Sequence, residues 1–277
     1  MSYKNVMVYV DDHAVGEARL ALAAEIAAHF GGRVLGIVGS PTESPVVDTF
    51  TGGAMLGEMA TLFRDIAEAD VKKAEAAFWK GAGEDRIRFE WRGRTGYPCD
   101  VVGHAMRAAD IVIVGRRDTG ALSPHALDPA DLLMIAGRPL MIVPPQPLRN
   151  PLGEPAVVAW TDSREAQRAV QAALPMLKAA SRVHVLEIAP EDAIAGAQSR
   201  TVDVADFLAA HGVVAEANAI RGDGSARSAQ IIGFAETLNA GLIVAGGYGH
   251  ARIREWVMGG VTQELLATAP VPVLLSH

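Results

Sequence analysis

An internal repeat is the feature of this sequence that most constrains its fold, because both copies must build the same kind of core. A β-branched apolar run at residues 6–10 ends in an acidic turn and leads into an alanine-rich helical pattern. A second run, at residues 156–160, leads into a similar pattern after an offset of 150 positions. Later, residues 111–115 match residues 242–246. The sequence therefore predicts two domains that share one fold.

A proline-rich stretch separates the two copies. Residues 144–155 carry five prolines, which cannot donate hydrogen bonds inside a sheet and which favour an extended spacer. We therefore place the domains at residues 1–146 and 154–277. The later match has an offset of 131, and the difference of 19 positions falls largely in residues 40–59, which we expect to form a surface excursion.

Each half alternates short apolar strands with longer segments of helical period. The strands are apolar throughout, which is typical of a sheet that is covered on both faces. This pattern predicts an α/β fold of two Rossmann-like, doubly wound domains, each with a five-stranded, mainly parallel sheet flanked by helices. In such folds a ligand binds beyond the carboxyl ends of the strands, where the winding direction reverses. The expected strands lie near residues 5–10, 33–38, 86–92, 111–115 and 140–143, and near 156–160, 182–188, 214–220, 242–246 and 271–275.

Composition limits the partners and the compartment. Half of the 277 residues are hydrophobic, which suits a folded core, and 25 basic against 32 acidic residues disfavour DNA or RNA as a partner. The first 12 residues lack an apolar run long enough for a signal peptide or a membrane span, so we expect no membrane association. The single cysteine, Cys99, cannot form an internal disulfide. These features favour a cytoplasmic protein.

A glycine-rich segment follows the fourth expected strand of the second half. Gly246, Gly249, Gly259 and Gly260 are spaced so that they begin at a strand end and lead into a helix. Glycine lets backbone amides approach an anion, and a helix N-terminus carries partial positive charge, so this segment can receive phosphate. The alternative is that these glycines only form a tight turn and a helix break.

This segment resembles the nucleotide motif of the universal stress protein family, Gly-x2-Gly-x9-Gly followed by Ser or Thr. The resemblance covers both halves and implies a tandem member that binds ATP, ADP or AMP. It implies that the glycine segment wraps the phosphates and that adenosine lies over the ends of the first two strands of the second half. The implied binding residues are Ala159, Trp160, Thr161, Asp162, Ser163, Ile188, Gly246, Gly249, Gly259, Gly260, Val261 and Thr262. His250 and Arg252 follow the glycine turn and could contact phosphate, and Arg252 could equally pair with Glu255 or remain solvated.

Two positions depart from the family pattern. Gly260 stands where the family has Ser or Thr, which removes a hydroxyl and keeps the amide. Thr161 stands where the family often has Asp, and the carboxylate of Asp162 is displaced by one residue. Asp162 can replace it only if the strand has already ended, because neighbouring residues of a strand point to opposite faces. This departure weakens the case for bound Mg²⁺ and leaves AMP or ADP nearly as suitable as ATP.

The first half carries a degenerate copy of the same motif. There the spacing places Gly115, Asp118 and then Asp128 followed by Pro129. Two carboxylates would repel phosphate, and proline has no amide proton to offer. Asp128 and Pro129 are instead a favourable N-cap and first residue of a helix. We therefore expect one nucleotide site, in the second half, and a first half that is structural.

Other candidate sites have simpler explanations. Asp11, Asp12 and His13 could join Asp118 and Asp128 around a divalent cation, but a solvated acidic rim is the favoured interpretation because no dense ligand motif is present. Trp160 at a strand end is more often a core residue than an adenine contact. Neither a metalloprotease motif nor a nucleophile elbow is present, so no residue is assigned a catalytic role.

Three functions remain open from the sequence. The first is a regulatory, non-enzymatic protein of stress response that binds an adenine nucleotide. The second is a slow ATP hydrolase or phosphotransferase that uses Asp162 and His250. The third is a module that holds another small, lipid-like molecule between the halves, with residues 40–59 as a lid. The resemblance also implies that residues 138–144 and 271–276 pair across a two-fold axis within one chain, so that the tandem is its own dimer; a further homodimer stays open.

Overall fold

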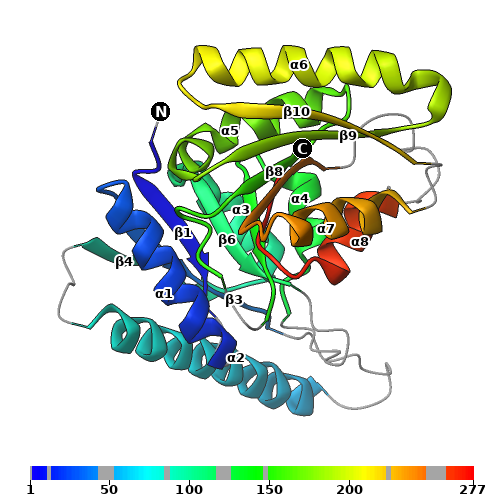
Figure 1. Ribbon diagram of the computed structural model, residues 1–277. Coiled ribbons are helices and arrows are strands. Elements are labelled where there is room, and N and C mark those ends of the chain that lie inside the picture. The colour runs from blue at the N-terminus through cyan, green and yellow to red at the C-terminus, as the bar shows by residue number, and fades with distance from the viewer. Residues whose placement is uncertain are drawn as a thin grey trace.

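The structure is a computed structural model of the whole chain, and it describes residues 2–10, 14–42, 53–83, 88–116, 126–145, 149–222, 226–247 and 260–277. Among these residues, ten strands form one continuous sheet in the order β10-β9-β8-β11-β12-β7-β6-β1-β2-β4. Figure 1 shows this sheet between the helix α6 at one end of the molecule and α2 at the other.

The expected α/β fold is confirmed, with the two halves built on the same strand order. The strands of the first half are β1 (Asn5–Tyr9), β2 (Arg33–Ile37), β4 (Phe89–Trp91), β6 (Ile111–Gly115) and β7 (Leu140–Val143). Those of the second half are β8 (Ala156–Ala159), β9 (Val183–Ala189), β10 (Ala215–Arg221), β11 (Leu242–Gly246) and β12 (Val273–Ser276). In each half the first strand is central, the second and third lie on one side of it, and the fourth and fifth lie on the other. The winding direction therefore reverses between β1 and β6, and between β8 and β11.

Helices cover both faces of the sheet. The first half has α1 (Ala14–His29), α2 (Gly53–Ala82), α3 (Pro98–Ala105), a 3-10 turn (Met106–Ala108) and α4 (Pro129–Ile135). The second half has α5 (Arg164–Ala179), a 3-10 turn (Glu191–Ala193), α6 (Ile194–Ala210), α7 (Arg227–Thr237) and α8 (Gly260–Thr268). One core cluster packs under α1, α5 and α6, and the other packs under α3, α4, α7 and α8. Each cluster runs across both halves, so the halves share their hydrophobic interior.

The two halves meet at an antiparallel seam inside the sheet. β7 and β12 pair with Leu140 opposite Leu275, Met141 opposite Leu274 and Ile142 opposite Val273, whereas the other ladders of this sheet are parallel. Antiparallel pairing of equivalent strands is what a two-fold relation between the halves requires. The expected pairing of the two last strands within one chain is thus present, and it joins the two five-stranded units into one sheet.

The first half is longer than the second for a reason that the sequence did not indicate. We expected a surface excursion at residues 40–59, but α2 already begins at Gly53 and extends for 30 residues, against 17 for its counterpart α6. Residues 43–52 lie outside the described part of the chain. A small two-stranded sheet, β3 (Gly39–Ser40) with β5 (Arg94–Thr95), lies next to this region. Residues 53–59 of this stretch are therefore helical, and Gly57 and Glu58 are exposed.

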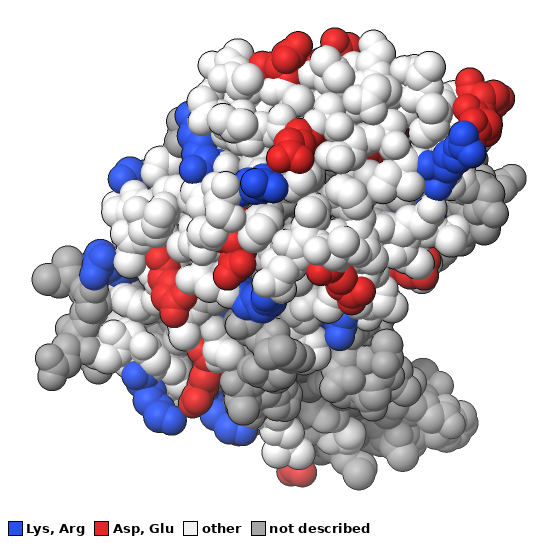
Figure 2. Space-filling model, in the orientation of Figure 1, with Lys and Arg blue, Asp and Glu red and all other residues white. Residues whose placement is uncertain are grey.

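Charged side chains are mixed on the visible surface. Figure 2 shows acidic and basic residues interspersed on this face, in keeping with a net charge of -7. Among the helices that the structure describes, none combines the length and the apolar character that crossing a bilayer demands.

Candidate functional site

The candidate site lies at the carboxyl edge of the parallel strands in the second half. β8 and β11 are neighbours, with Ala156 opposite Leu242 and Ala159 opposite Ala245. The winding reverses between these two strands, so the chain leaves them toward opposite faces of the sheet, which is where ligands bind in folds of this class. Two helices begin close to this edge, α5 after β8 and α8 after β11.

The residues that follow β8 divide into buried and exposed ones. Ala159 and Trp160 are each 8% exposed, and Trp160 packs in the core cluster under α5 and α6. Trp160 is therefore a core residue, as expected for an aromatic side chain at a strand end. Its indole Nε1 is buried and has no hydrogen-bond partner among the described residues. Thr161 and Asp162 are exposed beyond the strand end.

Ser163 begins the helix α5. Its Oγ accepts a hydrogen bond from the backbone N–H of Ala166 at 3.1 Å, and its backbone is extended, as an N-cap residue requires. The side chain is 8% exposed. The helix uses one of the two acceptor lone pairs of the Oγ, so the hydroxyl keeps its proton and one lone pair for a ligand.

Asp162 lies beyond the end of its strand, as it must if its carboxylate is to replace the missing Asp at position 161. β8 ends at Ala159, so the alternation of a strand no longer fixes the direction of the Asp162 side chain. Its carboxylate lies near Arg200 of α6. The pKa of Arg200 is raised, first by its hydrogen bonds to Glu187 and to a smaller extent by the negative charges of Glu187 and Asp162.

Sequence reasoning missed the ion pair between Arg200 and Glu187. Arg200 donates to both carboxylate oxygens of Glu187, which lies on β9 and is 8% exposed. The two residues are 13 positions apart, and a glutamate within a buried strand was the available signal. The pair places a satisfied, buried carboxylate beside the end of β8 and fixes α6 over β9.

Ile188 is packed away from solvent. It is 8% exposed, belongs to the core cluster under α7 and α8, and its Cγ2 fills the space where Gly222 would otherwise carry a Cβ. Its side chain therefore packs into the core at the end of β9 and contacts Gly222. A contact with adenosine, as the family resemblance implied, would use only the small exposed part of this residue.

Gly246 and the following glycine are required by close packing. A Cβ on Gly246 would lie 2.6 Å from the backbone nitrogen of Ala166, at the start of α5. A Cβ on Gly247 would lie 2.6 Å from Cδ2 of Leu133, on α4 of the first half. Real side chains do not approach so closely, so both glycines have a structural reason that is independent of any ligand.

Gly260 differs from these two glycines. It is the first residue of α8, and a Cβ there would meet no described heavy atom within 4 Å. Val261 is half-buried against the core, and Thr262 is 7% exposed, so its side chain points into the protein. The first backbone N–H groups of a helix have no partner within the helix. The start of α8 therefore offers amides rather than side chains to an anion.

The remaining candidates, Gly249, His250, Arg252 and Gly259, lie outside the described residues. The structure brings together the other ten at one edge: Ala159, Trp160, Thr161, Asp162, Ser163, Ile188, Gly246, Gly260, Val261 and Thr262.

The equivalent edge of the first half is arranged differently. Arg19 of α1 is 2% exposed, its Nε donates to the backbone oxygen of Tyr9 at 2.8 Å, and its Nη1 occupies the space beside Gly115. Asp128 accepts a hydrogen bond from the N–H of Ala130 at 2.8 Å, so it caps α4 as the sequence indicated. Arg116 donates to the backbone oxygen of Ala269, at the end of α8, at 3.1 Å.

Of two further candidates, the structure describes Cys99 but only one residue, Asp128, of the possible cation site. Cys99 is half-buried, and the pKa of its thiol is raised, mainly by burial. Within the described residues, no group of three or more His, Cys, Asp or Glu side chains is placed to hold a metal ion. Asp11, Asp12, His13 and Asp118 lie outside those residues.

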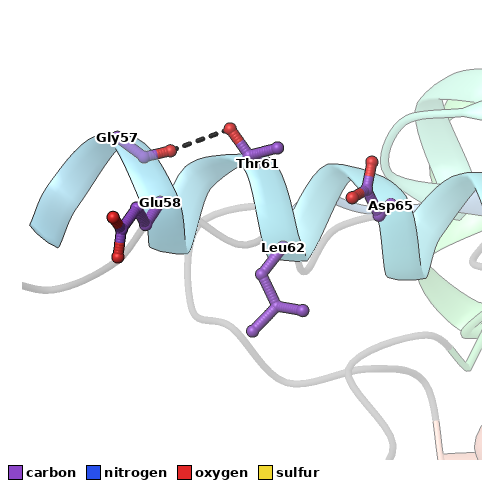
Figure 3. A pocket seen from close by; sticks show the side chains of 5 residues that line it. All are labelled: Gly57, Glu58, Thr61, Leu62 and Asp65. Carbon is purple, nitrogen blue, oxygen red and sulfur yellow. Dashed lines mark hydrogen bonds between the residues drawn. The ribbon is translucent and has the colours of Figure 1, made fainter.

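A shallow hollow lies on α2, far along the chain from the glycine segment. Gly57, Glu58, Thr61, Leu62 and Asp65 line it from one helix face, and Thr61 donates to the backbone oxygen of Gly57 at 2.9 Å (Figure 3). Two of its lining residues are acidic, so it differs from the apolar chamber that a lipid-like ligand requires.

Comparison with known proteins identifies the second half. Residues 154–277 match the family model of the universal stress protein family. The second half of this chain belongs to the universal stress protein family. The family expected from the glycine spacing is thus confirmed, and the match covers α5 to α8 together with the edge of the sheet described above.

Solved structures match the whole tandem. A universal stress protein from Archaeoglobus fulgidus aligns over 99% of this chain and 98% of its own, with 18% identity and a TM-score of 0.63. A functionally unknown protein from Pseudomonas aeruginosa aligns over 98% of this chain and 92% of its own, with 15% identity and a TM-score of 0.54. At these identities the matches show a shared fold over nearly the whole chain. No curated protein matches the sequence.

Proposed function

We propose that the second half binds one adenine nucleotide, ATP, ADP or AMP, and that the protein acts in stress response by binding rather than by catalysis. The observation that carries this proposal is the start of α8. A Cβ on Gly260, at a helix N-terminus, would meet no heavy atom of the described residues within 4 Å, on the edge where β8 and β11 diverge. That is where a phosphate group would be stabilised by unpaired amides and by the helix dipole.

The match of residues 154–277 to the universal stress protein family supports the same location. In this proposal the phosphates lie between Gly246 and Gly260, along the segment that includes Gly249 and Gly259. Adenosine lies over the end of β8, where Thr161 and Asp162 are the exposed groups. His250 and Arg252 are proposed as phosphate contacts. Asp162, beyond the strand end, is the carboxylate best placed to join Mg²⁺ bound to the phosphates.

The proposed role is a regulatory one. A bound nucleotide changes the state of a protein only if it binds two conformations with different affinities. In the described residues that follow β8, the groups near the proposed phosphate position are a capping serine and one carboxylate, and no hydrogen-bonded pair of nucleophile and base is present. We therefore expect retention of the nucleotide without turnover.

Two measurements on the purified chain test this function. Mass analysis of the small molecules released on denaturation should detect an adenine nucleotide, and calorimetric titration should give one binding site per chain. Phosphate release from ATP with Mg²⁺ is measured in parallel. Sustained release that is lost in Asp162→Ala would establish the hydrolase alternative, and the absence of any adenine nucleotide binding would refute the site.

A further inference from the structure

The point at which the glycine segment leaves the sheet is fixed by three contacts. The N–H of Gly247 donates to the backbone oxygen of Ser276 at 2.8 Å, and the Nδ1 of His277 lies 3.1 Å from the oxygen of Gly247. The third contact comes from the other half of the protein, because the side chain of Leu133 lies against the Cα of Gly247.

Leu133 is a fully buried residue of α4. The three heavy atoms nearest to a Cβ on Gly247 are its Cδ2, Cγ and Cδ1, at 2.6, 3.3 and 3.5 Å. The φ angle of Gly247 is not positive, so an alanine could adopt the same backbone. The steric obstacle to a side chain at Gly247 is therefore Leu133 and not backbone strain.

Gly246 provides a matched contrast. The atoms that a Cβ would meet there belong to the backbone of α5, at Glu165 and Ala166. A substitution cannot remove the backbone atoms that face Gly246, whereas it can shorten the side chain of Leu133 that faces Gly247. A side chain at Gly246 would clash with the second half of the protein, and one at Gly247 would clash with the first half. Only the clash at Gly247 can be relieved by a second substitution.

The helix that carries Leu133 begins at the degenerate motif of the first half. Asp128, which stands at a lost glycine position, caps α4 and so fixes the helix whose last turns reach Gly247. α4 and α8 are also in contact. The carboxylate of Asp128 thereby holds the helix whose Leu133 contacts Gly247, at the start of the glycine segment in the second half.

We propose that Leu133 is a positioning residue through which the first half sets the nucleotide affinity of the second. This inference rests on the proposed function. Packed interiors transmit small displacements because they contain few voids, and a binding site loses affinity when its groups move by about 1 Å. Leu133 fixes Gly247, and Gly247 fixes the departure of the glycine segment from β11.

A double-substitution cycle tests the proposal. ATP, ADP and AMP affinities are measured by titration for the wild type, Gly247→Ala, Leu133→Ala and the double variant, with the unfolding midpoint of each recorded without ligand. We expect Gly247→Ala to weaken binding about tenfold or more and Leu133→Ala to weaken it several-fold. The double variant should recover most of the affinity lost in Gly247→Ala, because removal of the Leu133 side chain makes room for the new methyl group.

Two controls separate positioning from general stability. Gly246→Ala should lose affinity that Leu133→Ala does not restore, since its obstacle is the backbone of α5. Leu132→Ala truncates the neighbouring buried leucine of the same helix and should lower the unfolding midpoint while leaving affinity within about twofold.

The outcomes are distinct. If the wild type binds none of the three nucleotides, the proposed function is refuted and this inference is refuted with it. If the wild type binds and the double variant stays as weak as Gly247→Ala, only the inference is overturned. Equal losses in Leu132→Ala and Leu133→Ala would likewise overturn it, because they would show an effect of stability alone.

Discussion

The hydroxyl of Tyr3 donates a hydrogen bond to the backbone oxygen of Ala172, 169 positions further along the chain, at 2.7 Å. The ring is 3% exposed and packs edge-on against Phe30. The residues just before β1 of one half are thus tied directly to α5 of the other. The shared core clusters and the β7–β12 pairing also connect the two halves, so we expect the halves to unfold together.

Removal of this hydroxyl should destabilise the whole chain. In Tyr3→Phe the oxygen of Ala172 loses its donor in a partly buried place, which costs about 1 kcal/mol of unfolding free energy. Urea denaturation followed by circular dichroism measures the change. A single cooperative transition shifted to lower urea is the expected result, and two separate transitions would contradict the coupling of the halves.

Tyr3 also gives a signature at high pH. Burial, with a smaller effect from the charge of Asp110, raises the pKa of Tyr3 above its ordinary value of 10.0. The unfolded chain then loses this proton first, so stability should fall as the pH rises above about 10. Unfolding free energies at several alkaline pH values should decline less steeply in Tyr3→Phe than in the wild type. Parallel declines would show that other groups cause the loss.

His184 should make the fold sensitive to mild acid. It is 4% exposed, and burial lowers its pKa from 6.5, against a raising effect of Glu216 and a further lowering by Arg182. Its Nε2 is buried and has no hydrogen-bond partner among the described residues. The unfolded state therefore takes up a proton first, and stability should fall as the pH drops below 6.5. Denaturation between pH 7 and pH 5 should show a smaller decline in His184→Gln.

The ion pair between Arg200 and Glu187 should contribute to stability through its buried partner. In Arg200→Ala the carboxylate of Glu187 is left buried without its donor, which we expect to cost about 2 kcal/mol of unfolding free energy. The double variant Arg200→Ala, Glu187→Gln removes the isolated charge and should regain part of this loss. A double variant no more stable than Arg200→Ala would count against the unpaired charge as the cause.

A carboxylate at the start of α8 should abolish the favourable field for phosphate. Gly260→Asp places a negative charge where a side chain meets no described atom, so the fold should tolerate it while nucleotide affinity falls at least about tenfold. Gly233→Asp, on α7, adds the same group at another open position and is the matched control. Calorimetric titration of both variants provides the comparison. Equal affinities in the two would place the phosphates elsewhere.

Much of the fold could be predicted from the sequence because the apolar strand patterns occur twice, and each copy supports the assignment of the other. The strands at residues 111–115, 140–143 and 242–246 have the expected bounds, and the last strands pair as the resemblance implied. The long helix α2 was missed at its start, where Thr51, Gly52 and Gly53 have the composition of a loop. Tertiary contacts of the later turns, such as buried Phe78, hold that helix.

The roles of the glycines could not be derived from spacing. Gly246, Gly247 and Gly260 are indistinguishable in the sequence. In the structure a Cβ on Gly246 would meet the backbone of α5, one on Gly247 would meet a leucine of the other half, and one on Gly260 would meet no described atom within 4 Å. Leu133 is 114 positions from Gly247, and nothing in its local pattern distinguishes it from Leu132. The contact between Leu133 and Gly247 forms only because the two five-stranded units join at β7 and β12.

That seam has an evolutionary consequence. A homodimer built on the same two-fold contact encodes both edges with one set of codons, so any change in one appears in the other. Here the two copies are covalently linked and inherit substitutions separately. Arg19 and Asp128 can therefore occupy one edge of the sheet while Gly246 and Gly260 occupy the equivalent edge of the other half, an asymmetry that a symmetric homodimer cannot encode.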